Sequence, residues 1–292
     1  MAALKRAGWV LAAATALVVL PGCKSNPGSV LGPVRKALGE APAAGVEMFA
    51  LRVGTSPGAP RDYFIADPEM PGRIQVAFSF WALKTEERLI LIDCGFVDPG
   101  RAERWGIADW RGPAALLAEA GLSSASVTDV VLTHGHWDHV GGLGSFPTAR
   151  VWVDPKELAS ATAEALQAEP ALGRVLAKLA HQPRLRSLEA VAAIAPGVVA
   201  FPSRLHAPGA WVVAVRAANG VWVFASDEVP LYRNLERRIP SGQTSDPGRS
   251  KILFDRLLEL TGGLAERIVP GHDPAVYQRF PGVTDRVVRL SP

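Results

Sequence analysis

The chain has 292 residues, of which 48% are hydrophobic and 20% charged, and its formal net charge is +3. This length is enough for one large domain with a substantial buried core. The nearly balanced charge and the lack of a Lys/Arg block argue against nucleic acid as a partner.

The first 23 residues have the composition of a processing signal. Lys5 and Arg6 precede an apolar run, residues 8–20, that is too short to span a bilayer comfortably. The following Leu20-Pro21-Gly22-Cys23 resembles a bacterial lipobox. We therefore expect a signal peptide, lipidation of Cys23, and an exported bacterial lipoprotein whose membrane anchor leaves it facing the periplasm or the cell exterior. Because Pro21 is unusual in such a box, plain cleavage and retention as a membrane anchor are the alternatives.

Residues 24–44 are rich in Gly, Pro and Ala, and we expect them to form a tether ahead of a domain at 45–292. The chain has two cysteines. If Cys23 carries lipid, Cys94 has no partner, so we expect no disulfide within the chain and a small buried side chain at Cys94.

The first half of the domain has the pattern of five strands with helices after them. Apolar runs place the strands at 46–53, 74–83, 88–92, 127–132 and 151–153. A helix is expected around 113–120, where Gly121 ends it. A helical region starts at Asp154-Pro155, extends to about His181 and is interrupted at Pro170.

The second half repeats this pattern. Strands are expected at 198–201, 211–216 and 221–225, and Asn219-Gly220 is a signal for a two-residue hairpin between the last two. A helix is expected at 247–260.

The most informative segment is the run from Thr133 to His139, which holds three of the six histidines and follows an apolar strand. Neutral imidazole is the commonest nitrogen ligand of transition metals, and a carboxylate adds an anionic oxygen. Residues two apart in an extended segment project to the same side, so His134 and His136 can converge on one ion. Asp138 and His139 then point elsewhere. The run therefore predicts two neighbouring ions.

Four ligands cannot complete two coordination spheres, so further ligands must come from later in the chain. His206 lies in a turn before the strand at 211–215, Asp227 closes the strand at 221–226, and His272 ends a short apolar run. Each stands at a strand end, where a loop can carry it into a shared cleft. His181, in an Ala/Leu-rich helical stretch, is interpreted as an ordinary surface residue.

Taken together, these motifs resemble the metallo-β-lactamase superfamily, in the same order along the chain. The matching segments are Leu91–Gly95 with its early Asp-x-Gly turn, Thr133–His139 with its signature run, Leu205–Gly209 with its third-histidine turn, Ser226-Asp227 with its bridging aspartate, and Pro270–His272 with its last ligand. In the third-histidine turn, Ala207 and Ala210 replace a threonine and a second histidine that are often found there.

The resemblance implies a set of metal ligands and a fold. One zinc-like ion would be held by His134, His136 and His206, a second by Asp138, His139 and His272, and Asp227 would bridge them. Zn is the expected metal, with Fe or Mn as alternatives. Asp93 would support a ligand histidine from behind, and the alternative is a purely structural turn. The implied fold is of the α/β (α+β) class, a four-layer αββα sandwich with the active cleft at one sheet edge.

Two features of the expected substrate pocket follow. The helical insertion at about 155–186 would form one wall, or alternatively a helix pair that merely packs on the outer layer. Phe96, Trp137 and Tyr232 would line an apolar pocket near the metals.

The implied chemistry is hydrolysis. Two ions about 3.5 to 4 Å apart lower the pKa of a shared water to about 7 and hold a bridging hydroxide ready as the nucleophile. Asp138 would orient that hydroxide, and Asp227 would take part in protonating the leaving oxygen.

The segments around Asp227, at 232–236 and at 270–274, look most like those of N-acyl homoserine lactonases. We therefore expect a small-molecule enzyme that opens the ring of acyl homoserine lactones or related lactones. The alternatives are an ester, thioester, phosphodiester or β-lactam hydrolase of the same superfamily, and a binding lipoprotein without turnover. Pro230 stands where lactonases carry a tyrosine. Either Tyr232 supplies the missing hydroxyl, or it packs at an interface and the metals act alone.

Overall fold

The structure is a computed structural model that describes residues 30–43 and 45–290. The predicted signal segment and Cys23 lie outside these residues. No helix in the described part of the chain is long and apolar enough to cross a membrane.

The first sheet has seven strands in the order β12-β1-β2-β3-β4-β5-β6. Neighbours from β12 to β3 run antiparallel, whereas β3, β4, β5 and β6 run parallel. The parallel part needs crossover connections, and these contain the helices of the first half. The strands are β1 (Glu47–Pro60), β2 (Arg73–Lys84), β3 (Leu89–Ile92), β4 (Asp129–Val131), β5 (Arg150–Val153), β6 (Leu185–Ser187) and β12 (Val287–Arg289).

The second sheet has five strands in the order β11-β10-β9-β8-β7, and only β10 and β11 are parallel. The predicted hairpin between β9 and β10 is present. Gly220 pairs with Ala217, so the turn residues are Ala218 and Asn219, one position earlier than expected. The strands are β7 (Ala192–Ala195), β8 (Val198–Pro202), β9 (Trp211–Ala217), β10 (Gly220–Ser226) and β11 (Ile268–Pro270).

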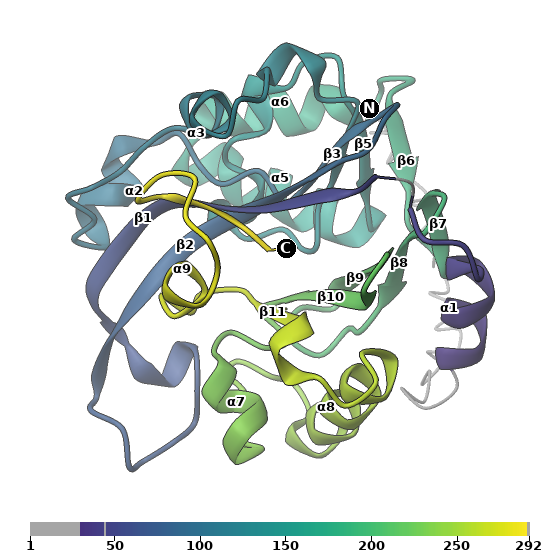
Figure 1. The fold of residues 1–292 in the computed structure, drawn as a ribbon. Helices are drawn as coiled ribbons and strands as arrows, with labels where there is room; N and C mark the ends of the chain where they lie inside the picture. The colour runs from purple at the N-terminus through teal and green to yellow at the C-terminus, as the bar shows by residue number, and fades with distance from the viewer. Residues whose placement is uncertain (1–29, 44, 291–292) are drawn as a thin grey trace, which may run out of the picture.

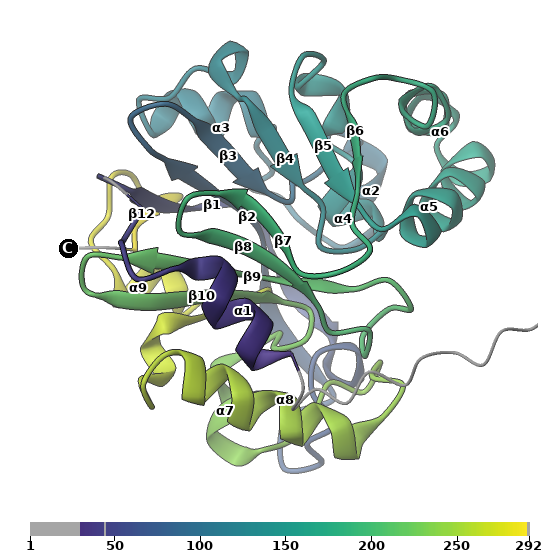
Figure 2. The ribbon, with the colours of Figure 1, turned by 90° about the vertical axis from the view of Figure 1, so that its right-hand side faces the viewer.

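Helices cover the outer face of each sheet, so the layers run helix, sheet, sheet, helix (Figure 2). The first sheet carries α3 (Pro113–Glu119), α5 (Pro155–Ala168) and α6 (Pro170–Leu179), and the second carries α1 (Leu31–Leu38), α7 (Tyr232–Arg237) and α8 (Pro247–Leu260). The remaining α-helices of the described residues are α2 (Pro99–Arg104), α4 (Trp137–Val140) and α9 (Val276–Arg279). The expected four-layer αββα sandwich is confirmed.

Alternation along the strands explains this layering, because successive side chains of a strand point to opposite faces. On β2, Phe80 packs under the helices of the first half, whereas Trp81 faces the other sheet. Trp81 meets Phe224 of β10 there, with ring centroids 5.9 Å apart. Full burial of one such side chain contributes about 2 kcal/mol. The two sheets are therefore held by a continuous apolar layer.

The expectation that residues 24–44 form a tether is wrong for Leu31–Leu38. This segment forms α1, which packs against the second sheet through its buried residues Leu31, Val34 and Leu38 (Figure 1). Their spacing of three and four residues puts them on one helix face. Gly32 and Pro33, two of the residues that suggested a tether, lie in the first turn of this helix. Pro is tolerated there because its missing N–H would have no helical partner.

The helical insertion breaks at Pro170, as expected, into α5 and α6, which pack on each other and on the outer face of the first sheet. Its last residues form β6 at the edge of that sheet. No residue of the insertion lines the pocket at the metal-ligand candidates. The interpretation as a pocket wall is therefore wrong, and the packing alternative is right.

Candidate metal centre

The predicted ligands meet where several strands end. The run from His134 to His139 follows β4, His206 lies in the loop between β8 and β9, Asp227 follows β10, and His272 follows β11. The structure brings all seven into two adjoining clusters, and within each cluster the candidate ligand atoms lie within 4.8 Å of one another. His181, by contrast, lies apart on the exposed surface next to α6.

The first cluster contains His134, His136 and His206. Nδ1 of His136 lies 2.9 Å from Nε2 of His134 and 3.1 Å from Nε2 of His206. Burial, together with the neighbouring histidines, holds the pKa of His134 well below its ordinary value, and burial lowers that of His206 to about 4. Both imidazoles are therefore neutral near pH 7 and offer lone pairs, as metal binding requires.

The second cluster contains Asp138, His139 and His272, all buried. Nε2 of His139 lies 3.3 Å from the Asp138 carboxylate, and Nε2 of His272 lies 3.7 Å from it. Burial disfavours charge on His139, but Asp138, Asp93 and Asp227 outweigh that effect and raise its pKa well above the ordinary value. The protein surrounds this imidazole with negative charge, which is an environment suited to a cation.

Asp227 contacts both clusters, one with each carboxylate oxygen. Its Oδ1 lies 3.0 Å from His272 Nε2 and 3.3 Å from His139 Nε2, whereas its Oδ2 lies 3.4 Å from His206 Nε2. Burial opposes its ionisation, yet the surrounding histidines hold its pKa well below the ordinary value. This is the geometry of a carboxylate shared between two sites.

The residues present fit two bound cations. The ion-pair partners of Asp138 and Asp227 within the described residues are all histidines. Nε2 of His139 is buried and has no hydrogen-bond partner there. A buried imidazole nitrogen that makes no hydrogen bond and lies 3.3 Å from two carboxylates is suited to a bound divalent ion, which takes nitrogen and carboxylate ligands together.

Asp93 lies directly behind the second cluster. His139 Nδ1 donates to its carboxylate at 2.7 Å, and the backbone N–H and hydroxyl of Thr133 donate to it at 2.7 and 2.8 Å. Because Nδ1 of His139 donates to Asp93, Nε2 is the ring nitrogen that faces Asp138 and Asp227 and is left for a bound ion. Asp93 also has φ of 59°, so it forms a tight turn as well. The contact with His139 agrees with the expected support of a ligand histidine, and Asp93 shapes the turn in addition.

The family comparison agrees with this geometry. The model of the metallo-beta-lactamase superfamily matches residues 78–272, which include all seven candidate ligands. The chain belongs to this superfamily.

Among its relatives in the superfamily are two mycobacterial proteins. A probable metallo-hydrolase of Mycobacterium tuberculosis is 26% identical over 232 residues, covering 67% of this chain and 74% of the relative. A probable metallo-hydrolase of Mycobacterium bovis matches to the same extent.

Solved structures share the superfamily fold. A quorum-quenching N-acyl homoserine lactone lactonase has a TM-score of 0.64 at 19% identity, covering 81% of this chain and 95% of its own. An N-acyl homoserine lactone hydrolase with the product N-hexanoyl-L-homoserine at its catalytic metal centre has a TM-score of 0.63 at 18% identity, with 80% and 96% covered. A probable metal-dependent hydrolase from Staphylococcus aureus has a TM-score of 0.64 at 16% identity, with 80% and 91% covered.

Glu157 is a buried carboxylate whose role the sequence did not predict: it joins two loops that carry candidate metal ligands. Glu157, in the first turn of α5, accepts hydrogen bonds from the backbone N–H of Gly135 at 2.9 Å and of Gly209 at 2.7 Å. A Cβ at Gly209 would lie 2.7 Å from the Glu157 side chain, and one at Gly135 would lie 2.9 Å from its backbone oxygen. Glycine at both positions therefore permits the close approach.

A second unpredicted carboxylate, Glu228, supports the same third-histidine turn from another side. The backbone N–H groups of Leu205 and His206 donate to one of its oxygens, both at 3.1 Å. Burial raises the pKa of Glu228. Ala207 and Ala210, which depart from the superfamily pattern, therefore lie in a turn whose backbone N–H groups donate to two buried carboxylates, Glu157 and Glu228. In the sequence, the position of Glu228 directly after Asp227 is the signal that could have pointed to this role.

A small pocket of about 150 Å³ opens onto the clusters. Trp137 is part of the pocket wall, as expected. Phe96 is buried and does not line the pocket; its ring packs against that of Trp137, with the two ring centroids 4.8 Å apart. The expectation that Phe96 lines the pocket is wrong. The lining residues are Tyr63, Phe64, Phe78, Trp105, His136, Trp137, Asp138, Asp227, Gln243 and His272.

Tyr232 also does not line this pocket. Its side chain is 2% exposed and belongs to the core between the sheets, where Arg279 stacks on the ring with its guanidinium carbon 3.9 Å from the centroid. Burial raises the pKa of its hydroxyl. The hydroxyl has no hydrogen-bond partner among the described residues. The structure therefore corrects the catalytic interpretation of Tyr232 in favour of interfacial packing.

We expect Tyr232→Phe to leave hydrolytic activity within about twofold of the wild type and to stabilise the protein by about 1 kcal/mol, because it removes a buried hydroxyl without a partner. Thermal unfolding and kcat/KM on the same preparation check both points. A tenfold loss of kcat with unchanged stability would return Tyr232 to the reaction site.

Proposed function

We propose that this protein is a dinuclear metal-dependent hydrolase that opens lactone rings. The observation that carries the proposal is the pair of buried ligand clusters joined by Asp227, next to a pocket with aromatic walls. A non-catalytic binding protein would have no need to bury so many polar groups around one pocket, since each costs free energy unless it is paired.

The chemistry is that of metal-assisted attack on a carbonyl. Two divalent ions bound by the clusters would polarise the carbonyl oxygen and make a water acidic enough to act as a nucleophile near neutral pH. Asp138 lines the pocket and can accept a hydrogen bond from that water, which fixes its direction of attack. Asp227 lines the same pocket and could take up the proton that the attacking water releases and deliver it to the leaving oxygen as the ring C–O bond breaks. The rings of Trp137, Phe64 and Phe78 exclude bulk water from the remaining walls.

Two further points support a lactone as the substrate. Solved structures with this fold include N-acyl homoserine lactone hydrolases. The pocket volume of about 150 Å³ admits a small ring but is below the range of about 300–1,000 Å³ that holds a whole drug-sized ligand. The reacting part of the substrate is therefore compact.

A hydrolysis panel with the zinc-loaded, full-length protein tests this function. We expect turnover of acyl homoserine lactones and simple lactones, reported by a pH indicator because ring opening releases acid, and loss of that turnover after chelation. Thioesters, aryl phosphodiesters and β-lactams complete the panel. Cleavage of a phosphodiester or a β-lactam without turnover of any lactone would exclude the lactonase proposal.

A further inference from the structure

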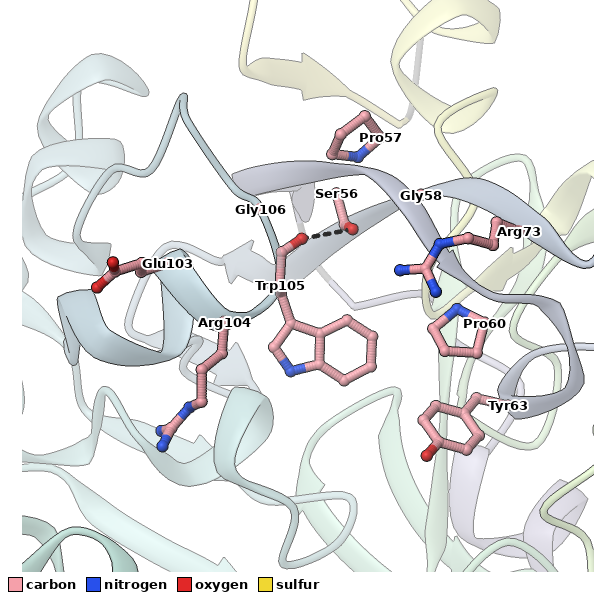
Figure 3. Close-up of a pocket in the computed structure, with 10 residues that line it drawn as sticks. All are labelled: Ser56, Pro57, Gly58, Pro60, Tyr63, Arg73, Glu103, Arg104, Trp105 and Gly106. Atoms are coloured by element: carbon pink, nitrogen blue, oxygen red, sulfur yellow. Dashed lines mark hydrogen bonds between the residues drawn. The ribbon is translucent and has the colours of Figure 1, made fainter.

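A second, larger cleft adjoins the metal pocket. It has a volume of about 500 Å³ and lies between the far end of β1, the start of β2 and the end of α2 (Figure 3). Its lining residues are Ser56, Pro57, Gly58, Pro60, Tyr63, Arg73, Glu103, Arg104, Trp105 and Gly106. We call it the outer cleft.

The outer cleft and the metal pocket share two walls. Tyr63, in the 3-10 helix Arg61–Tyr63, and Trp105, directly after α2, line both of them. The centroids of the two rings lie 6.2 Å apart. A substrate whose reacting ring fills the small metal pocket must extend beyond it, and the space on the other side of these two rings is the outer cleft.

The walls of the outer cleft are fixed to each other. The Ser56 hydroxyl donates to the backbone carbonyl of Trp105 at 2.6 Å, which ties β1 to the end of α2. The backbone N–H of Thr55 donates to the Asp109 carboxylate at 2.8 Å on the same side. The cleft therefore exists before a ligand enters, and binding need not order it.

The chemistry of the outer cleft combines flat apolar faces with a free cation. Trp105 and Tyr63 supply the rings, and Pro57 and Pro60 add apolar wall. The guanidinium of Arg73 makes no ion pair or hydrogen bond with any described residue, and Figure 3 shows it extending toward the Trp105 side of the cleft. A guanidinium presents its N–H groups in a planar fork that matches a carboxylate or phosphate.

The other charged residues do not cancel this cation. Arg104 is a second cation at the outer cleft, and its charge is partly balanced by Asp98, which lies 3.8 Å away. Glu103 is the one carboxylate lining the outer cleft, and Figure 3 shows it on the far side of Trp105 from Arg73, pointing away. A negative group that enters between Tyr63 and Trp105 therefore meets Arg73 first.

We propose that the outer cleft is the subsite for the substrate's tail and that Arg73 binds an anionic group, a carboxylate or a phosphate, at the end of that tail. This inference rests on the proposed function for the identity of the reacting ring, but its ligand chemistry comes from the outer cleft alone. It makes Arg73 a specificity-determining residue rather than a catalytic one.

The test compares homoserine lactones whose amide-linked tails have equal length and end in a carboxylate, a phosphate or a methyl group. With the zinc-loaded wild type, we expect an anionic end to lower KM about fivefold relative to the methyl end, the size of a partly exposed charge pair. Arg73→Gln should bring the KM ratio close to one, with kcat retained. Arg174→Gln, an exposed arginine on α6 away from both pockets, is the matched control and should keep the preference.

A binding measurement separates this inference from the proposed function. The same three tails on cyclopentylamine carry no lactone, and titration calorimetry reports their affinity for wild type and Arg73→Gln. A preference for the anionic tails that disappears in Arg73→Gln supports the subsite even if no lactone is hydrolysed. An equal affinity for anionic and methyl tails in the wild type, or a preference that survives Arg73→Gln, overturns it.

Discussion

Replacing His206 by alanine is expected to leave one bound ion per chain instead of two and to lower kcat/KM about a thousandfold or more. His206 is the one histidine of the first cluster that comes from outside the signature run, and its Nε2 lies within 3.4 Å of both His136 Nδ1 and Asp227 Oδ2. Without it, the first ion loses a nitrogen ligand. A metal ion contributes several kcal/mol of transition-state stabilisation, and each 1.4 kcal/mol corresponds to about a tenfold change in rate.

Metal analysis after desalting, together with steady-state kinetics, checks this expectation. His181→Ala is the matched control, because His181 is exposed and belongs to neither cluster. It should retain two ions and full activity. A His206→Ala protein that still holds two ions would refute the assignment of His206 as a ligand.

The second large effect is expected at Asp93. Asp93→Asn keeps the size of the side chain and a residue type that tolerates positive φ, but it leaves one acceptor oxygen for donors that now use two. His139 Nδ1 then loses its charged acceptor, and its orientation is no longer fixed. Loss of such a supporting partner lowers metal affinity by about 10- to 100-fold. We expect that loss for the second ion.

Competition with a chelator of known zinc affinity measures the effect at Asp93. Asp129→Asn provides a control of similar burial, because Asp129 accepts hydrogen bonds from Thr128, Arg150 and Trp152 and belongs to neither cluster. It should reduce the free energy of unfolding without changing zinc affinity. Wild-type zinc affinity in Asp93→Asn would show that Asp93 serves only the turn.

The parts of the fold that could be predicted from sequence are those whose burial repeats with a clear period. The helix at 247–260 has its predicted bounds. The strand expected at 74–83 is one residue longer at each end, and the strand expected at 211–216 is one residue longer at its end. The candidate ligands could be placed together because each follows a strand, and strand ends of a layered sandwich meet at one edge.

What could not be predicted depends on tertiary contacts. The short β6 and β7 are stabilised mainly by pairing with β5 and β8, so their own composition says little. A glutamate in the first turn of a helix, such as Glu157, is ordinarily attributed to the helix dipole, and only the fold reveals its two backbone donors. The side-chain directions of Phe96 and Tyr232 likewise follow from packing, which the local pattern near the motifs does not specify.

The hydrogen bonds of Glu157 bear on how the metal centre comes into being. They bind a loop from each half of the chain, and they use no ligand atom, so they form whether or not an ion is present. In many small metal-binding domains the ion itself organises the chain, and part of its binding free energy is offset by the entropy of folding. Here the loops that carry His136 and His206 are already set side by side by the insertion helix. We therefore expect metal binding to a preformed site, with little change in the backbone between the metal-free and the metal-loaded protein.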